Sequence, residues 1–212
     1  MKPQKPTKDT LNKNYILNTA LDLIDKDTLS KFNMRKLGKE MGVSQMAVYR
    51  YFDSQGALFD DLVELIWKKA LLIKTNSPKN TWQEQLMNSM AQLRQALLKH
   101  PNVLPLISTH PLVTQTQFAL IEDILNGLKT KGLEIQPTTV FLINSLTAYT
   151  LGFVWTEAIE PKNGGKPDLQ VLENIQKKSD ILNLLLSPLQ DKKFTSDEQF
   201  QLGIKALING WK

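Results

Sequence analysis

Apolar residues recur at intervals of three and four positions through most of the chain, and no run of strict alternation predicts a β-strand. The clearest stripe lies in residues 9–26 and consists of Ile16, Leu17, Ala20, Leu21, Leu23 and Ile24. This period is typical of amphipathic helices that bury one face in a core. The pattern therefore predicts an all-α fold.

Two short helices are predicted after the first one. Asn33 is a good N-cap for a helix over residues 34–41, and Ser44 for one from Gln45 to about residue 51. Gly42 lies between them and can adopt the positive φ that a tight turn requires. Two short helices joined in this way form a helix-turn-helix. Ser54 then caps a long connecting helix over residues 55–74.

The rest of the chain is also predicted to be helical. Thr81 and Glu84 have the spacing of a capping box for a helix over residues 82–100, and three prolines allow a short irregular helix in 101–111. Further helices are expected over residues 113–131, 137–159, 168–186 and 196–211, with a loop at 160–167. The predicted architecture is a three-helix head, a connecting helix and a larger helical body.

Composition narrows the classes of protein that fit. The 212 residues include no cysteine, which excludes disulfides and thiolate metal sites. No stretch reaches 18 uninterrupted apolar residues, so no transmembrane helix is predicted. The basic first eight residues precede no apolar segment, so we expect a disordered arm and not a signal peptide. A cytoplasmic location fits these features.

Positive charge is concentrated in the first third of the chain. Residues 1–75 contain 13 Lys and Arg against 9 Asp and Glu, whereas the remainder contains 13 against 12. Residues 28–52 carry five basic side chains and one acidic one: Lys31, Arg35, Lys36, Lys39, Arg50 and Glu40. Such a patch attracts polyanions. A solvated lysine-rich surface has the same composition, so charge alone leaves both interpretations open.

The segment Ser-Gln-Met-Ala-Val-Tyr-Arg-Tyr-Phe, residues 44–52, places three aromatic side chains beside an arginine. Helical spacing directs Val48 and Phe52 inward, while the other side chains stay outward or at the rim. The cluster is therefore predicted to divide between core packing and an exposed surface.

These segments resemble the tetracycline-repressor (TetR) family of bacterial transcription regulators. The matching stretches of the head are residues 16–24, 33–44 and 47–52, followed by Leu58 and Leu62. The body resembles the tetracycline-repressor subgroup in residues 82–86, 93–100, 108–111 and 149–154. The resemblance implies a homodimer that inserts the third helix of each head into a major-groove half-site of a palindromic operator.

The resemblance assigns DNA contacts to Asn33, Arg35, Ser44, Gln45, Met46, Ala47, Tyr49, Arg50, Tyr51 and Gln55. Arginine can pair with guanine and glutamine with adenine, so Arg35, Gln45 and Arg50 are the candidates for reading bases. Which of Gln45 and Arg50 does so is left open. The two tyrosine hydroxyls are expected on phosphates. Gln55 replaces a lysine common in the family, so its phosphate contact is expected to be weaker.

For the effector site the resemblance points to Ser89, Gln92, Leu93, Leu106, Thr109, His110, Phe118 and Tyr149. Tetracycline-responsive members hold a metal-bound drug with a histidine shortly before the turn at residues 108–111. Here residues 103–107 read Val-Leu-Pro-Leu-Ile. A more apolar effector is therefore expected, with no metal and no cofactor. His110 is also open to a purely structural interpretation, and so is His100.

The dimer interface is predicted on two helices and comprises Leu146, Tyr149, Phe153, Phe200, Ile204, Leu207, Ile208 and Trp211. The resulting domain assignment is an arm at 1–8, a DNA-binding domain with its connecting helix at 9–75, and an effector-binding and dimerisation domain at 76–212. Two alternatives accompany this ligand-responsive repressor. One is a dimeric regulator controlled by a protein partner. The other, an enzyme, lacks a nucleophile–base pair and a phosphate loop.

Overall fold

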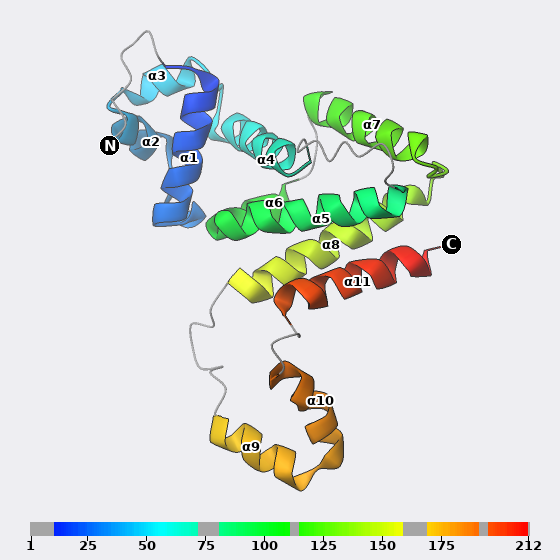
Figure 1. Ribbon diagram of the computed structural model, residues 1–212. Helices are drawn as coiled ribbons and strands as arrows, with labels where there is room; N and C mark the ends of the chain where they lie inside the picture. The colour runs from blue at the N-terminus through cyan, green and yellow to red at the C-terminus, as the bar shows by residue number, and fades with distance from the viewer. Residues whose placement is uncertain (1–10, 72–80, 111–114, 159–168, 191–194, 212) are drawn as a thin grey trace. The chain divides into compact units, whose positions relative to one another are not determined.

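The described residues of the N-terminal part fold mostly into helices, as the apolar pattern predicts (Figure 1). The computed structural model describes residues 11–71, 81–110, 115–158, 169–190 and 195–211. The helix α1 (Lys13–Asp27) begins at Asn12, whose side chain accepts a hydrogen bond from the backbone of Tyr15. All six apolar residues of its predicted stripe are buried. A short 3₁₀ turn, η1 (Leu29–Lys31), leads to the buried Phe32.

The helix-turn-helix consists of α2 (Met34–Met41) and α3 (Gln45–Tyr49). Asn33 and Ser44 cap the two helices through their side chains, and Gly42 ends α2 with φ 72°. Leu37, Met41 and Val48, which was predicted to face inward, are fully buried, whereas Val43 is half-buried. The connecting helix α4 (Gln55–Leu71) then packs against α1 and against α5.

The body begins with α5 (Trp82–Lys99), which opens with the predicted capping box of Thr81 and Glu84. The proline-rich stretch folds into η2 (Pro101–Val103) and α6 (Leu104–Thr109). The helix α7 (Gln115–Thr130) follows and ends before Gly132, which has φ 95°. The chain divides into two compact units near this point, Met1–Thr139 and Val140–Lys212.

The second unit contains α8 (Thr139–Ala158), α9 (Leu169–Lys178), α10 (Asp180–Gln190) and α11 (Ser196–Gly210). The single helix predicted over residues 168–186 is wrong, because two helices occur there, α9 and α10. The side chain of Ser179 accepts a hydrogen bond from the backbone of Leu182 and so starts α10. The helix α11 begins with a capping box formed by Thr195 and Glu198. The predicted loop at 160–167 and the arm at 1–8 lie outside the described residues.

Within the described residues, α8 is the one helix long and apolar enough to cross a membrane by length and composition. The criterion of uninterrupted apolar residues did not select it, because Asn144, Ser145 and Thr147 interrupt the run. A helix of a protein core or interface has the same composition. Composition alone therefore does not show what α8 packs against, and the residues on its exposed face have to be considered.

The separation of α2 and α3 depends on Gly38. A Cβ atom added at this position would lie 3.0 Å from the carbonyl oxygen of Val43 and 3.2 Å from the backbone nitrogen of Gln45. Both atoms belong to the backbone, so a larger residue would have to push α3 away from α2. A side chain at this position would therefore require a small shift of the backbone between α2 and α3.

We predict that Gly38→Ala lowers the free energy of unfolding by about 1–3 kcal/mol because of this overpacking. Chemical denaturation followed by circular dichroism measures the change. Gly56→Ala is the matched control, since its Cβ would meet the Ser54 hydroxyl at an ordinary 3.5 Å. Alanine favours a helix over glycine, so the control should be neutral or slightly more stable. Equal stability of both variants would show that the α2–α3 turn has room for a side chain.

Candidate functional site

The helix α3 presents one buried and one exposed face. Val48 is fully buried and fixes the helix on the head, while Met46 is 70% exposed. Gln45 and Arg50 are also exposed. Ser44 uses its hydroxyl as the acceptor for the backbone N–H of Ala47. Within residues 45–50, the exposed side chains that can reach a ligand outside the head are therefore those of Gln45, Met46 and Arg50.

The other residues predicted to contact DNA differ in the exposure of their side chains and in the hydrogen bonds that these side chains already make. Arg35 is exposed, whereas Ala47, Tyr49 and Gln55 are half-buried. The side-chain oxygen of Asn33 accepts the backbone N–H of Lys36, so this residue serves α2 as its cap.

The structure corrects the prediction for Tyr51. Its hydroxyl donates a hydrogen bond to the carbonyl oxygen of Leu11 at 2.6 Å. A phosphate requires a donor, and a phenol has one proton. Tyr51 therefore attaches the start of α1 to the end of the helix-turn-helix and has no proton left for a phosphate.

The basic patch predicted from residues 28–52 is on the surface of the head. Lys31, Arg35, Lys39 and Arg50 are exposed. Lys36 lies 3.7 Å from the carboxylate of Asp27, an exposed ion pair that contributes little to stability. The head thus exposes cations on η1, on α2 and directly after α3, which suits a polyanionic ligand.

The eight residues predicted for the effector site differ in their exposure. Ser89, Leu93 and Leu106 are buried. Thr109 is exposed and its hydroxyl donates to the carbonyl oxygen of Pro105, while Phe118 is 59% exposed. A stripe at helical spacing predicts burial, but it does not distinguish the wall of a ligand site from ordinary core.

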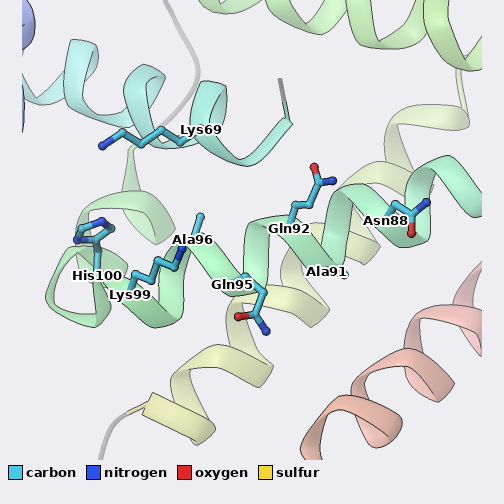
Figure 2. A pocket seen from close by; sticks show the side chains of 8 residues that line it. All are labelled: Lys69, Asn88, Ala91, Gln92, Gln95, Ala96, Lys99 and His100. Carbon is cyan, nitrogen blue, oxygen red and sulfur yellow. The ribbon is translucent and has the colours of Figure 1, made fainter. Parts of the chain in front are cut away.

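A pocket of about 440 Å³ lies along the outer face of α5 beside α4 (Figure 2). Of the predicted effector residues, only Gln92 lines it. The full lining is Lys69, Asn88, Ala91, Gln92, Gln95, Ala96, Lys99 and His100. Figure 2 shows the side chain of Lys69 on α4 extending toward the His100 end of α5 and away from Asn88. Among the described residues, no group of three or more His, Asp or Glu side chains could hold a metal ion.

Both histidines of the chain contact aspartates that are distant in sequence. His100 Nδ1 lies 2.5 Å from a carboxylate oxygen of Asp25 in α1, and His110 Nε2 lies 2.9 Å from a carboxylate oxygen of Asp60 in α4. His110 thus has a partner within the protein, as its structural interpretation requires, and its contact with an effector stays a prediction. Sequence analysis could not find these pairs, because 75 and 50 positions separate the partners and neither pair has a local pattern.

The residues predicted for dimerisation divide into two sets. Leu146, Phe200, Ile204 and Ile208 are buried within the single chain, so their assignment to an interface is wrong. Phe153, Leu207 and Trp211 are half-buried.

Tyr149 was expected both at the effector site and at the interface, but it packs within the second unit. Its ring stacks on Phe200 at 5.7 Å between centroids, and Phe153 meets Phe200 edge to face at 5.3 Å. A Cβ at Gly203 would overlap the tyrosine ring. An apolar stripe cannot tell packing within a chain from packing between chains.

A different face of α8 is exposed. Phe141, Ser145, Ala148, Gly152 and Trp155 are all exposed and follow one another at intervals of three or four residues. They lie on one side of the helix, opposite the buried Leu146 and Thr150. The sequence contained this signal, because small residues at helical spacing between two aromatics indicate a surface for close helix packing.

Comparisons with known proteins agree with this geometry. Residues 16–62 match the model for bacterial regulatory proteins of the tetR family, and residues 75–212 match the model for the tetracyclin repressor-like C-terminal domain. The chain is 28% identical over 204 residues to the tetracycline repressor protein class E of Escherichia coli, covering 92% of this chain and 88% of that protein.

It is also 25% identical over 156 residues to an HTH-type transcriptional regulator of Saccharopolyspora erythraea, which is 74% of this chain and 65% of that protein. The fold matches the crystal structure of the Streptomyces coelicolor TetR family protein ActR in complex with actinorhodin. The TM-score is 0.69 at 19% identity, over 94% of this chain and 96% of that one.

The model for the C-terminal domain alone spans more than half of the chain. The helix-turn-helix that precedes this domain exposes basic side chains. The chain therefore belongs to the tetR family of bacterial regulatory proteins and is a DNA-binding transcriptional regulator.

Proposed function

We propose that the protein is a homodimeric repressor that binds a palindromic operator in the cytoplasm and leaves it when a small, largely apolar effector binds the body. The observation that carries this proposal is the division of α3 into a buried face at Val48 and an exposed face with Gln45, Met46 and Arg50. A helix held in this way can enter the major groove with its polar side chains toward the bases.

Backbone groups of the head support the same orientation. The N-termini of α2 and α4 are capped by Asn33 and Ser54 through the N–H groups of Lys36 and Ala57. The N–H groups at the first positions of each helix stay available, and their partial positive charge suits a phosphate. Phosphates on both sides of the groove would then fix the register of α3, while Gln45 and Arg50 read bases.

The homodimer is supported by the exposed face of α8. Only 28% of the most apolar window of this helix is buried within the chain, which leaves Phe141 60% exposed and Trp155 43% exposed. Ser145, Ala148 and Gly152 between them are small enough for a second helix to approach closely. A second copy presents the same surface, so the face can pair with itself around a two-fold axis. Leu202 of α11, 60% exposed, extends the apolar surface of this unit.

The apolar character proposed for the effector is supported by the residues of α6 and by a solved structure of the same fold. The described part of α6 buries Leu104, Leu106 and Ile107, so apolar side chains occupy the place where a histidine would be needed for a metal-bound drug. The ActR structure holds actinorhodin, a ligand other than tetracycline, in a protein of the same fold. We therefore infer an apolar effector for the body of this chain.

We predict that Gln45→Ala relaxes sequence specificity, whereas Gln55→Ala weakens all DNA binding slightly and equally. Both glutamines occupy the first position of a helix, so the pair is matched. Selection of bound duplexes from random DNA gives the operator, and titration gives the affinities. Loss of a bidentate base contact costs about 1–3 kcal/mol at one position of each half-site. Unchanged base preferences in Gln45→Ala would leave Arg50 and Arg35 as the base-reading side chains.

We predict that Gly152→Arg converts the protein to a monomer, because the long side chain separates the two α8 helices. Gly127→Arg is the matched control. Both are helical glycines at which an added Cβ would meet no atom within 4 Å in the single chain. Light scattering at micromolar concentration measures the mass. A monomeric wild-type protein would contradict the dimer, and a dimeric Gly152→Arg variant would place the interface elsewhere.

A further inference from the structure

Two aspartates of the α1–α4 segment are each held by the body in the same two-point arrangement. A carboxylate oxygen of Asp25 lies 2.5 Å from His100 Nδ1, and the backbone carbonyl of Asp25 accepts a hydrogen bond from Asn102 Nδ2 at 2.8 Å. We call these contacts the α1 clamp.

The second arrangement repeats the first one on another helix. A carboxylate oxygen of Asp60 lies 2.9 Å from His110 Nε2, and the backbone carbonyl of Asp60 accepts a hydrogen bond from Gln117 Nε2 at 3.2 Å. We call these contacts the α4 clamp. In both clamps a histidine meets the carboxylate and a side-chain amide meets the carbonyl of the same residue.

The two clamps act at different points of the first unit. His100 and Asn102 lie at the junction of α5 and η2, whereas His110 and Gln117 lie at the end of α6 and in α7. The segment α1–α4 already packs on the body through α4 against α5 and through α1 against η2. The two clamps add directional contacts at two separate points, on α1 and on α4, which restrain its orientation on α5–α7 further.

We propose that the two clamps are positioning devices for operator binding, which hold α3 in the orientation that its half-site requires. The proposal rests on the homodimer and the palindromic operator proposed above. A dimer that binds two half-sites at once must order both of its heads. Heads that are already oriented lose less conformational entropy when they bind, so the clamps raise affinity for the complete operator.

The surroundings of the clamps make them stronger than ordinary surface contacts. The four histidine and aspartate side chains are only 25–29% exposed. The other carboxylate oxygen of Asp25 is buried and has no hydrogen-bond partner among the described residues. Loss of His100 would thus leave the whole carboxylate unsatisfied at a partly buried site, which is costly.

Aromatic packing shields the α4 clamp in addition. The ring of Phe59 meets His110 edge to face at 6.4 Å between centroids, and Phe32 packs on Phe59 at 5.3 Å. The α1 clamp borders the pocket along α5, since His100 is part of its lining (Figure 2). The two clamps therefore have different neighbours, although their hydrogen-bonding pattern is the same and their histidine and aspartate side chains are about equally exposed.

The test compares the affinity for a complete palindrome, selected by the wild-type protein from random DNA, with the affinity for a duplex that carries one half-site. The variant His100→Ala/His110→Ala should bind the palindrome about tenfold more weakly, the equivalent of 1.4 kcal/mol. Its affinity for the single half-site should stay within about twofold, because one head can orient itself without reference to the other. A purely structural role of the histidines would lower thermal stability and leave this ratio unchanged.

Conservative variants provide the rescue. Asn at position 100 carries an N–H donor where His has Nδ1, and Gln at position 110 carries one where His has Nε2. His100→Asn/His110→Gln should therefore restore most of the preference for the palindrome. Lys131→Ala is the control, since it removes a 3.0 Å hydrogen bond to Gln85 within the body and should not change the ratio. Should the double alanine variant fail to fold, Asn102→Leu/Gln117→Leu, which retains both histidines, takes its place.

The possible failures are distinguishable. A wild-type protein that is monomeric, or that binds palindrome and half-site equally, would overturn the proposed function. A dimeric wild-type protein that prefers the palindrome, with the same preference in the clamp variants, would overturn the clamps alone.

Discussion

The distance between α2 and α3 is the constraint on which the DNA-binding surface depends. At Gly38 the backbone of α2 lies so close to residues 43–45 that no side chain fits without displacement. This approach brings Val48 into the core and turns Gln45 and Arg50 outward. The exposed face of α3 therefore follows from a backbone contact on the opposite side of the same helix. The side chains that would meet DNA do not take part in forming it.

In the second unit, too, the residues that pack inside the unit are separate from those that form the exposed face of α8. Leu146, Phe200 and Ile204 are buried, while Tyr149 and Phe153 pack on Phe200. The exposed face of α8, from Phe141 to Trp155, lies on the other side. Between these two aromatic residues the exposed face carries only the small residues Ser145, Ala148 and Gly152 at its helical spacing. Close approach of a second helix becomes possible there.

Local signals in the sequence predicted most of the fold. Caps such as Asn33, Ser44 and the Thr81–Glu84 pair lie within three or four residues of the groups they bind, so they are visible in a single sequence. The break at Ser179 was missed because the apolar pattern continues across it. The exposed position of Gln45 was likewise predictable, since it follows from the helical period once Val48 is placed inside.

What could not be predicted was the choice of partner for each side chain. The hydroxyl of Tyr51 has the same chemistry whether it meets a phosphate or the carbonyl of Leu11, and only the fold decides. The same holds for His110, whose partner Asp60 lies 50 positions earlier. For Phe200 and Ile208 the apolar stripe predicted burial correctly but left the covering surface undefined. Such contacts depend on the tertiary arrangement, which a periodic pattern does not contain.

The clamps on Asp25 and Asp60 also bear on how regulators of this kind can be recombined. Half of each clamp is a hydrogen bond to a backbone carbonyl, an acceptor that every residue type supplies. The other half requires one carboxylate on α1 and one on α4. A foreign α1–α4 segment with two aspartates in register would therefore keep both clamps, provided that its apolar residues also pack on α5 and η2. The polar part of the junction between operator recognition and the body thus demands two carboxylates of the sequence on the DNA side.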